Sequence, residues 1–134
     1  MRTLIAEDDL TSRLLLHGML KRYGQCDVVP NGRRAVEAVS ASLQTGALYD
    51  LICLDIMMPE LDGREALKAI RLVESRDGRT SAKVLMTTAL RDKENVLGAF
   101  REQADGYLVK PIQKAKLLEY LRSFELDDGT VDHG

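Results

Sequence analysis

The sequence predicts an α/β fold in which five parallel strands form one sheet, doubly wound by helices into a three-layer sandwich. Two observations predict it: five short, continuously apolar runs occur along the chain, and stretches with helical periodicity separate them. This alternation is typical of βαβ units with right-handed crossovers, which place helices on both faces of a parallel sheet. With 134 residues, the chain has room for one such domain and not for a second.

The expected strands are the runs in which apolar or β-branched residues follow one another, because the strands of a parallel sheet are buried on both faces. In chain order these runs are residues 3–6, 27–29, 51–54, 84–88 and 106–109. Asn31 and Gly32 follow the second run and form a turn signal. Each run is therefore predicted to be a short buried strand that leads into a crossover connection.

The expected helices are the stretches in which apolar residues recur every three or four positions, so that each helix buries one face. Their apolar stripes are Leu15, Leu16, Met19, Leu20 and Tyr23; Ala35, Val36, Val39 and Leu43; Ala66, Leu67, Ile70 and Val73; Val96, Leu97 and Phe100; and Leu117, Leu118, Leu121 and Phe124. Gly24 and Gly46 follow the first two stripes, at positions where glycine caps the C-terminus of a helix. The domain is expected to span residues 1–125, and the acidic, aperiodic segment 126–134 is expected to be a disordered or frayed tail.

Composition and charge exclude several classes of protein. The 19 Lys and Arg residues and 21 Asp and Glu residues give a net charge of −2 without a basic stripe, so no nucleic-acid partner is expected. No stretch approaches the roughly 20 apolar residues that cross a bilayer, and the N-terminus lacks a signal-peptide core. Cys26 and Cys53 form neither a disulfide framework nor a CxxC pair. No membrane association is expected, and a cytoplasmic location is predicted.

The polar residues at the ends of the predicted strands are the candidate functional residues, since parallel α/β sheets bind ligands at the carboxyl ends of their strands. The first run leads into Glu7, Asp8 and Asp9, the third into Asp55, and the fifth into Lys110 and Pro111, while the fourth ends in Thr87 and Thr88. One edge of the sheet should therefore gather at least three carboxylates, one or two hydroxyls and one ammonium group. Asp9 is interpreted as an acid that begins the first helix rather than as a metal ligand.

The charges at this edge indicate a metal site. Glu7, Asp8 and Asp55 would carry three negative charges, against which Lys110 supplies one positive charge. Two carboxylates about 5 Å apart repel by roughly 3 kcal/mol at an effective dielectric constant near 20. Raised carboxylate pKa values or a bound divalent cation would relieve this repulsion. Oxygen ligands suit Mg²⁺ (or Mn²⁺) rather than Zn²⁺. A carboxylate, a metal ion and a lysine in one cleft are together typical of a phosphoryl-transfer site.

Three segments resemble the receiver domain of two-component response regulators: residues 7–8 (ED), 55–63 (DIMMPELDG) and 106–111 (GYLVKP). In the second segment, a proline and a glycine stand four and eight residues after Asp55. The resemblance covers about residues 2–124 and implies a flavodoxin-like (βα)5 fold. The chain resembles the stand-alone type of receiver domain, as in the chemotaxis regulators, because no effector sequence is expected after it.

The resemblance implies that Asp55 is the phosphoacceptor, which takes the phosphoryl group from a histidine kinase or a histidine phosphotransfer protein. It also implies that Asp8, Asp55 and the main-chain carbonyl of Met57 ligate Mg²⁺ (or Mn²⁺), with Glu7 acting through water. Such a domain is not an enzyme, although it catalyses its own phosphorylation and dephosphorylation. It switches protein–protein interactions in a two-component phosphorelay.

The same resemblance assigns Lys110, Thr88 and Ala89 to the stabilisation of the phosphoryl group, and it makes Thr88 and Tyr107 the switch residues. Thr87 is the alternative to Thr88. Thr88 is preferred because it precedes Lys110 by 22 residues, the interval expected of the family.

The resemblance further implies a cis peptide bond before Pro111 and a partner face formed by helix 4, strand 5 and helix 5. This face would bind a downstream protein or a second copy of the chain. Met57 and Leu90 flank the mouth of the site and are apolar, whereas the chemotaxis regulator has polar or acidic side chains there that help to position water. We therefore expect slow self-dephosphorylation.

Three alternatives share this architecture or chemistry. An aspartate-nucleophile phosphohydrolase needs a second Asp two residues after the nucleophile, where this chain has Met57. A flavodoxin-type electron carrier needs a phosphate-binding loop after the first strand, where Glu7, Asp8 and Asp9 would repel a phosphate. A receiver-like module that binds partners without phosphorylation stays open, although the complete set of acids, threonine and lysine argues against it.

Overall fold

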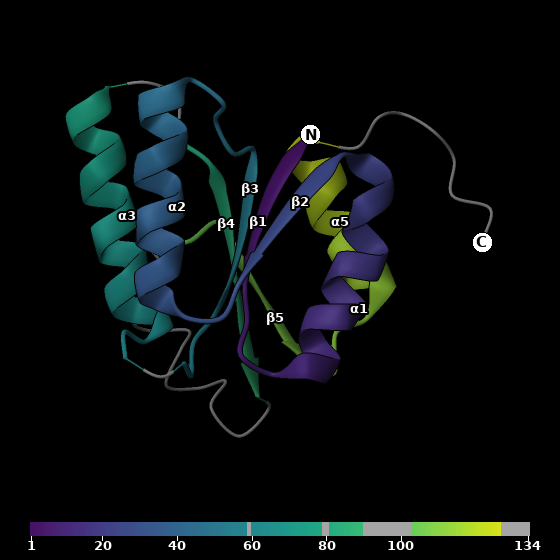
Figure 1. Cartoon of the computed structure of the whole chain (residues 1–134). Coiled ribbons are helices and arrows are strands. Elements are labelled where there is room, and N and C mark those ends of the chain that lie inside the picture. Colours follow the sequence, from purple (N-terminus) through teal and green to yellow (C-terminus); the bar gives the residue numbers. More distant parts are fainter. Residues whose placement is uncertain (59, 79–80, 90–102, 127–134) are drawn as a thin grey trace.

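The computed structural model describes residues 1–58, 60–78, 81–89 and 103–126. Five parallel strands form one sheet in the order β2-β1-β3-β4-β5, which confirms the predicted fold class (Figure 1). The strands are β1 (Arg2–Ala6), β2 (Gln25–Val29), β3 (Leu51–Asp55), β4 (Lys83–Ala89) and β5 (Gly106–Lys110). The helices are α1 (Leu10–Leu20), a 3-10 turn η1 (Lys21–Tyr23), α2 (Gly32–Thr45), α3 (Gly63–Asp77) and α5 (Lys114–Ser123).

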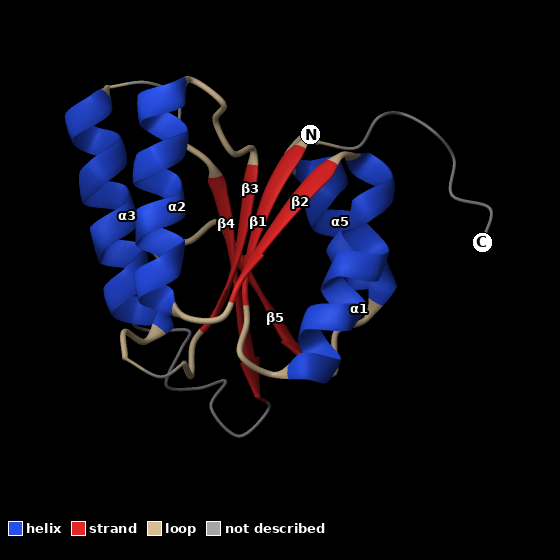
Figure 2. Cartoon of the chain, in the orientation of Figure 1, coloured by secondary structure: helices blue, strands red, loops and turns tan. Residues whose placement is uncertain are grey.

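Helices cover both faces of the sheet: α2 and α3 lie on one face, and α1 and α5 lie on the other (Figure 2). Because side chains alternate along a strand, each strand contributes to both cores. In β1, for example, Leu4 belongs to the core beneath α2 and α3, whereas Ile5 belongs to the core beneath α1 and α5. The same alternation decides which residues share one side of the sheet at its carboxyl edge.

The strands differ from the prediction in length and, at both edges of the sheet, in burial. Each observed strand is one or two residues longer than its apolar run, because polar residues such as Asp55 and Lys110 still belong to the sheet. In β2, Gln25 and Val28 are exposed, since β2 is an edge strand with only β1 beside it. In β5, the other edge strand, only Leu108 is buried. The prediction that all five strands are buried on both faces is therefore wrong for β2 and β5.

The predicted turn at Asn31 and Gly32 is instead the start of α2. The side-chain oxygen of Asn31 accepts a hydrogen bond from the N–H of Arg34 at 2.9 Å, so Asn31 is an N-cap. Asparagine favours turns and N-caps for the same reason, namely that its side chain bonds to nearby main-chain groups. Gly46 ends α2 in the left-handed conformation as predicted, whereas Gly24 ends the 3-10 turn η1 rather than α1 itself.

Two predicted segments fall mainly outside the described residues. The predicted fourth helix, with the stripe Val96, Leu97 and Phe100, lies outside them. Leu126 packs against the core and donates its N–H to the carbonyl oxygen of Leu121 at 2.9 Å. Residues 127–134 are not described, so the frayed tail stays a prediction. In the described part of the chain, no helix has the length and apolar character needed to span a bilayer.

The edge of the sheet opposite the carboxyl ends is held by Arg71 of α3. Its guanidinium donates hydrogen bonds to Glu74, to the carbonyl oxygens of Ala82 and Gln103, and to Asp105, at 2.8–3.0 Å. Glu74 is only 4% exposed and also accepts the N–H of Ala82 at 2.8 Å. These five residues, called the Arg71 network below, tie α3 to the chain segments that enter β4 and β5.

Candidate functional site

The carboxyl edge of the sheet brings three acids together. Glu7 follows β1 directly, Asp8 comes next, and Asp55 is the last residue of β3. Each offers one carboxylate oxygen, and these oxygens lie within 4.8 Å of one another. Glu7 and Asp55 are buried, whereas Asp8 is exposed. The acids that the sequence places at this edge therefore form one cluster.

Lys110, the last residue of β5, reaches into this cluster. Its Nζ lies 2.7 Å from Glu7 Oε1 and 3.2 Å from Asp55 Oδ2. Burial by itself would lower the pKa of Lys110, but the hydrogen bonds and charges of Glu7 and Asp55 outweigh burial and raise that pKa. The ammonium group is therefore protonated at neutral pH and links the two buried acids.

Burial and the neighbouring acids raise the pKa values of two carboxyl groups in the cluster. Burial, followed by the hydrogen bond and charge of Glu7, raises the pKa of Asp55 from 3.8 to about 6, although Lys110 opposes this shift. Burial and the neighbouring Asp55 also raise the pKa of Asp8. The folded site therefore disfavours the charged form of the carboxylate that is the candidate nucleophile.

Two local structures fix the acids in place. Asp9 is the N-cap of α1, as interpreted from the sequence, and hydrogen bonds from Ser12 lower its pKa. On the other side of the site, Gly63 begins α3 and donates its N–H to the carbonyl oxygen of Ile56 at 2.9 Å. A Cβ at position 63 would lie 2.4 Å from the carbonyl oxygen of Asp55, so only glycine lets α3 begin against the acceptor strand.

The donor set fits a hard divalent cation. Both oxygens of Glu7 already accept hydrogen bonds, one from a lysine and one from a threonine, whereas Asp8 is exposed. Asp55 is likewise in contact through both oxygens, with the N–H of Met57 and with Lys110, each at 3.2 Å. An all-oxygen site of this kind suits Mg²⁺ or Mn²⁺, and direct ligation by Asp8 and Asp55 stays a prediction. The ligand role of the Met57 carbonyl and the water contact of Glu7 stay predictions.

The two threonines of β4 have different partners. Thr88 Oγ1 donates to the carbonyl oxygen of Ala89, and Thr87 Oγ1 donates to Glu7 Oε2, both at 3.1 Å. Both threonines are buried. The contact between Thr87 and Glu7 was not among the predictions, because the spacing to the lysine favoured Thr88. The contact depends on the register of the sheet, in which Thr87 is the partner of Asp55 across β3 and β4.

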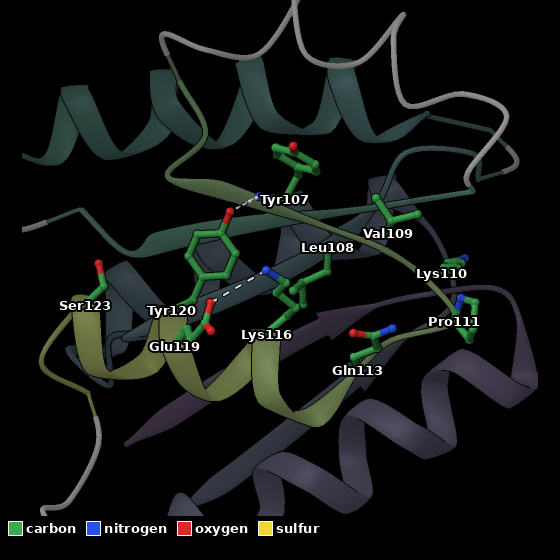
Figure 3. A pocket seen from close by; sticks show the side chains of 10 residues that line it. All are labelled: Tyr107, Leu108, Val109, Lys110, Pro111, Gln113, Lys116, Glu119, Tyr120 and Ser123. Carbon is green, nitrogen blue, oxygen red and sulfur yellow. Dashed lines mark hydrogen bonds and ion pairs between the residues drawn. The ribbon is translucent and has the colours of Figure 1, made fainter.

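Beyond the acids, β5 and α5 enclose a pocket of about 580 Å³ (Figure 3). Tyr120 extends from α5 toward β5, and its hydroxyl accepts a hydrogen bond from the N–H of Tyr107 at 3.3 Å. A Cβ at Gly106 would lie 2.3 Å from the Tyr120 ring, so glycine permits this contact. The peptide bond between Lys110 and Pro111, at the end of β5, is cis.

Three further candidate residues lie around the mouth of the site. The side chain of Met57, two residues after Asp55, is 61% exposed. Ala89 ends β4 as the register partner of Lys110, so its small side chain stands next to the cluster. Leu90 lies outside the described residues.

A doubly wound parallel sheet with an acidic cluster and a lysine at its carboxyl edge defines an α/β domain with a candidate phosphoryl-transfer site. The chain belongs to the response regulator receiver domain family, which matches residues 3–122. It is 30% identical over 118 residues to the chemotaxis protein CheY of Bacillus subtilis, and the match covers 88% of this chain and 92% of CheY.

A longer protein and a solved structure to which the chain is similar agree with this family assignment. The chain is 31% identical over 124 residues to hybrid signal transduction histidine kinase L of Dictyostelium discoideum; the match covers 92% of this chain but only 7% of that kinase. The chain is also similar to a solved structure, the receiver domain of sensor histidine kinase PA1611 from Pseudomonas aeruginosa, which has a magnesium ion coordinated in its active site cleft. The TM-score is 0.74 and the sequence identity is 28%, and the match covers 92% of this chain and 95% of that chain. The chain is thus a receiver domain of two-component signalling.

Proposed function

We propose that the chain accepts a phosphoryl group on Asp55 from the phosphohistidine of a histidine kinase or histidine phosphotransfer protein. The observation that carries the proposal is the buried acidic cluster in which Lys110 contacts the Asp55 carboxylate at 3.2 Å. In the transfer, an Asp55 oxygen bonds to phosphorus while the phosphorus–nitrogen bond breaks and its electron pair returns to the imidazole. Apart from this self-modification and its reversal, the domain acts by binding proteins and not as an enzyme.

The residues of the cluster have distinct roles in this proposal. Asp8, Asp55 and the main-chain carbonyl of Met57 would hold Mg²⁺ (or Mn²⁺), with Glu7 in contact through water. When bound, the cation neutralises charge that develops on the phosphoryl oxygens. Lys110, held by Glu7 at 2.7 Å, supplies a second positive charge and turns from Asp55 to a phosphoryl oxygen.

The residues of β4 and β5 would carry the switch. Phosphorylation replaces a carboxylate of charge −1 by a group of about −2, which favours new hydrogen bonds to it. The Thr88 hydroxyl, which donates to the Ala89 carbonyl oxygen, would donate to a phosphoryl oxygen instead. The small side chain of Ala89 would leave space for the phosphoryl group. Tyr107, on the neighbouring strand, would change its packing in response.

Apolar side chains around the site suit a protein donor. Leu10 and Leu14, one turn apart on α1, are 57% and 61% exposed, and Met57 is equally exposed beside the acceptor. A downstream target or a second copy of the chain would bind the face formed by helix 4, β5 and α5, of which β5 and α5 are described. A cytoplasmic location, and the expectation of no nucleic-acid or membrane partner, stay predictions.

Incubation with Mg²⁺ and acetyl phosphate or phosphoramidate, followed by intact mass measurement, tests the proposal. We expect a gain of one phosphoryl group that hydroxylamine removes, because hydroxylamine cleaves acyl phosphates. No gain from either donor or from any histidine kinase would favour the phosphorylation-independent alternative. Continuous release of inorganic phosphate without a phosphoprotein would favour the phosphohydrolase.

Met57→Asn is expected to speed the loss of the phosphoryl group about tenfold, because a carboxamide positions attacking water and a thioether does not. The measurement is the decay of the phosphoprotein mass after removal of the donor. Met57→Leu, which keeps the position apolar, should decay at the wild-type rate. A Met57→Asn protein that decays no faster than the wild type would contradict the expectation. Leu90→Glu is predicted from the sequence to act in the same direction.

A further inference from the structure

We propose that Thr87 is a positioning residue of the phosphoryl-transfer site: its hydroxyl orients Glu7, and Glu7 in turn holds Lys110. The inference rests on the proposed function and adds a residue to it. It starts from Glu7, which is 0% exposed although it carries a carboxylate. A carboxylate so deeply buried needs a hydrogen-bond partner on each oxygen, because an unpaired one is costly.

The structure supplies partners for both oxygens of Glu7. Oε1 accepts hydrogen bonds from Lys110 Nζ at 2.7 Å and from the N–H of Asp9 at 3.3 Å. Oε2 accepts the hydroxyl of Thr87 at 3.1 Å. With partners on both sides, the carboxylate has one preferred orientation, and that orientation presents Oε1 to Lys110.

The position of Thr87 in the sheet makes it suitable for this task. Glu7 follows β1 and Thr87 lies in β4, and β3 runs between these two strands. The hydrogen bond between them therefore spans the strand that carries Asp55. The carbonyl oxygen of Thr87 also accepts the N–H of Ile56 at 3.0 Å, so the main chain of Thr87 is fixed to the acceptor strand.

The distances around Lys110 show what this orientation achieves. Its Nζ lies closer to Glu7, at 2.7 Å, than to Asp55, at 3.2 Å. In the proposed transfer Lys110 must leave Asp55 for a phosphoryl oxygen, and a fixed Glu7 keeps the ammonium in place meanwhile. Without the Thr87 hydroxyl, Oε2 of Glu7 loses its partner, so the carboxylate is held through Oε1 alone and its orientation toward Lys110 is less strictly fixed. The Thr87 hydroxyl donates its hydrogen bond to Glu7 and not to Asp55, so Thr87 acts through Glu7.

Three substitutions separate this role from simple packing. Thr87→Val removes the hydroxyl at nearly constant volume, and Thr87→Ser keeps it. Thr3→Val is the matched control: Thr3 is equally buried in β1, and within the described part of the chain its hydroxyl has no hydrogen-bond partner.

Two readouts test the variants. The first is the rate of phosphorylation by phosphoramidate at saturating Mg²⁺. The second, which needs no phosphorylation, is the ¹H–¹⁵N spectrum of the lysine ammonium groups, with the Lys110 signal assigned through Lys110→Arg. Thr87→Val is expected to react about tenfold more slowly and to shift or broaden the Lys110 signal, because a hydrogen bond to a charged group is lost. Thr87→Ser and Thr3→Val should match the wild type in both.

The outcomes are distinct. An unchanged Lys110 signal in Thr87→Val overturns the proposal whatever the rate, and so does a Thr87→Ser protein as slow as Thr87→Val. If the wild type takes no phosphoryl group from the donor, the proposed function fails. The ammonium spectrum then still decides whether Thr87 holds Glu7 and Lys110.

Discussion

Asp55→Asn is expected to abolish phosphorylation and, at the same time, to stabilise the folded protein. A carboxamide offers no carboxylate oxygen to phosphorus, so the mass gain should vanish. The stabilisation follows from the pKa of Asp55, which is raised from 3.8 to about 6 because burial and Glu7 disfavour its charged form. At about 1.4 kcal/mol per pKa unit, the charged carboxylate costs the folded state about 3 kcal/mol at neutral pH. Asparagine removes this cost.

The difference in the free energy of unfolding between wild type and Asp55→Asn should grow as the pH rises. Below about pH 4, Asp55 is protonated in the folded and unfolded states alike, so the two proteins should be nearly equal in stability. As the pH rises from there to about 6, the folded state holds a proton that the unfolded chain has released. The free energy of unfolding of the wild type therefore falls through this range, while that of Asp55→Asn lacks this contribution.

Urea unfolding in EDTA at low and neutral pH measures the effect. Glu119→Gln removes an exposed carboxylate on α5 and should leave the free energy of unfolding nearly unchanged. Added Mg²⁺ should narrow the gap between wild type and Asp55→Asn, because a cation that binds the folded state stabilises it. If wild type and Asp55→Asn are equally stable at neutral pH in EDTA, burial and Glu7 do not disfavour the charged form of Asp55 as described. If Asp55→Asn is still phosphorylated, the phosphoacceptor is another residue.

Arg71→Met is expected to lower the free energy of unfolding by about 3 kcal/mol, because it leaves Glu74 as a buried carboxylate without its cation. Glu74 is 4% exposed and, among the described residues, would keep only the N–H of Ala82, while Asp105 would lose its guanidinium partner. Methionine retains the apolar part of the side chain, so the loss reports mainly on charge and hydrogen bonds. Urea unfolding at neutral pH is the measurement.

A double variant and a surface control complete this test. Arg71→Met combined with Glu74→Gln should recover part of the lost stability, because the uncompensated charge is gone. Arg33→Met removes an exposed ion pair with Glu37 and should cost less than about 1 kcal/mol. If Arg71→Met is no more destabilising than Arg33→Met, the Arg71 network does not hold the structure together. Phosphorylation should survive in Arg71→Met, since the network lies at the opposite edge of the sheet.

The fold and the acidic cluster could be predicted because both depend on local patterns. Asp55 and Lys110 end their strands, and parallel topology alone brings strand ends to one edge. The exposure of β2 could not be predicted in the same way, because a short apolar run does not reveal its place in the strand order. Asn31 predicted a turn and not the N-cap of α2 for a related reason, namely that turns and helix caps use the same side-chain chemistry.

The missed contacts join residues that are far apart in the sequence. Thr87 and Glu7 are 80 residues apart, and their hydrogen bond depends on strand order and register together. Arg71 likewise contacts Asp105, which is 34 residues away in the sequence. Such contacts follow from the assembled sheet, and a motif of neighbouring residues carries no sign of them.

The hydrogen bond from Arg71 to the Gln103 carbonyl has a mechanical consequence. The same guanidinium also bonds to Asp105, which precedes β5, and to the carbonyl oxygen of Ala82, which precedes β4. The amino ends of β4 and β5 are therefore joined to α3 at the edge of the sheet opposite Asp55. A rearrangement of β4 and β5 that follows phosphorylation would be largest at the carboxyl edge, because their other ends are held in place.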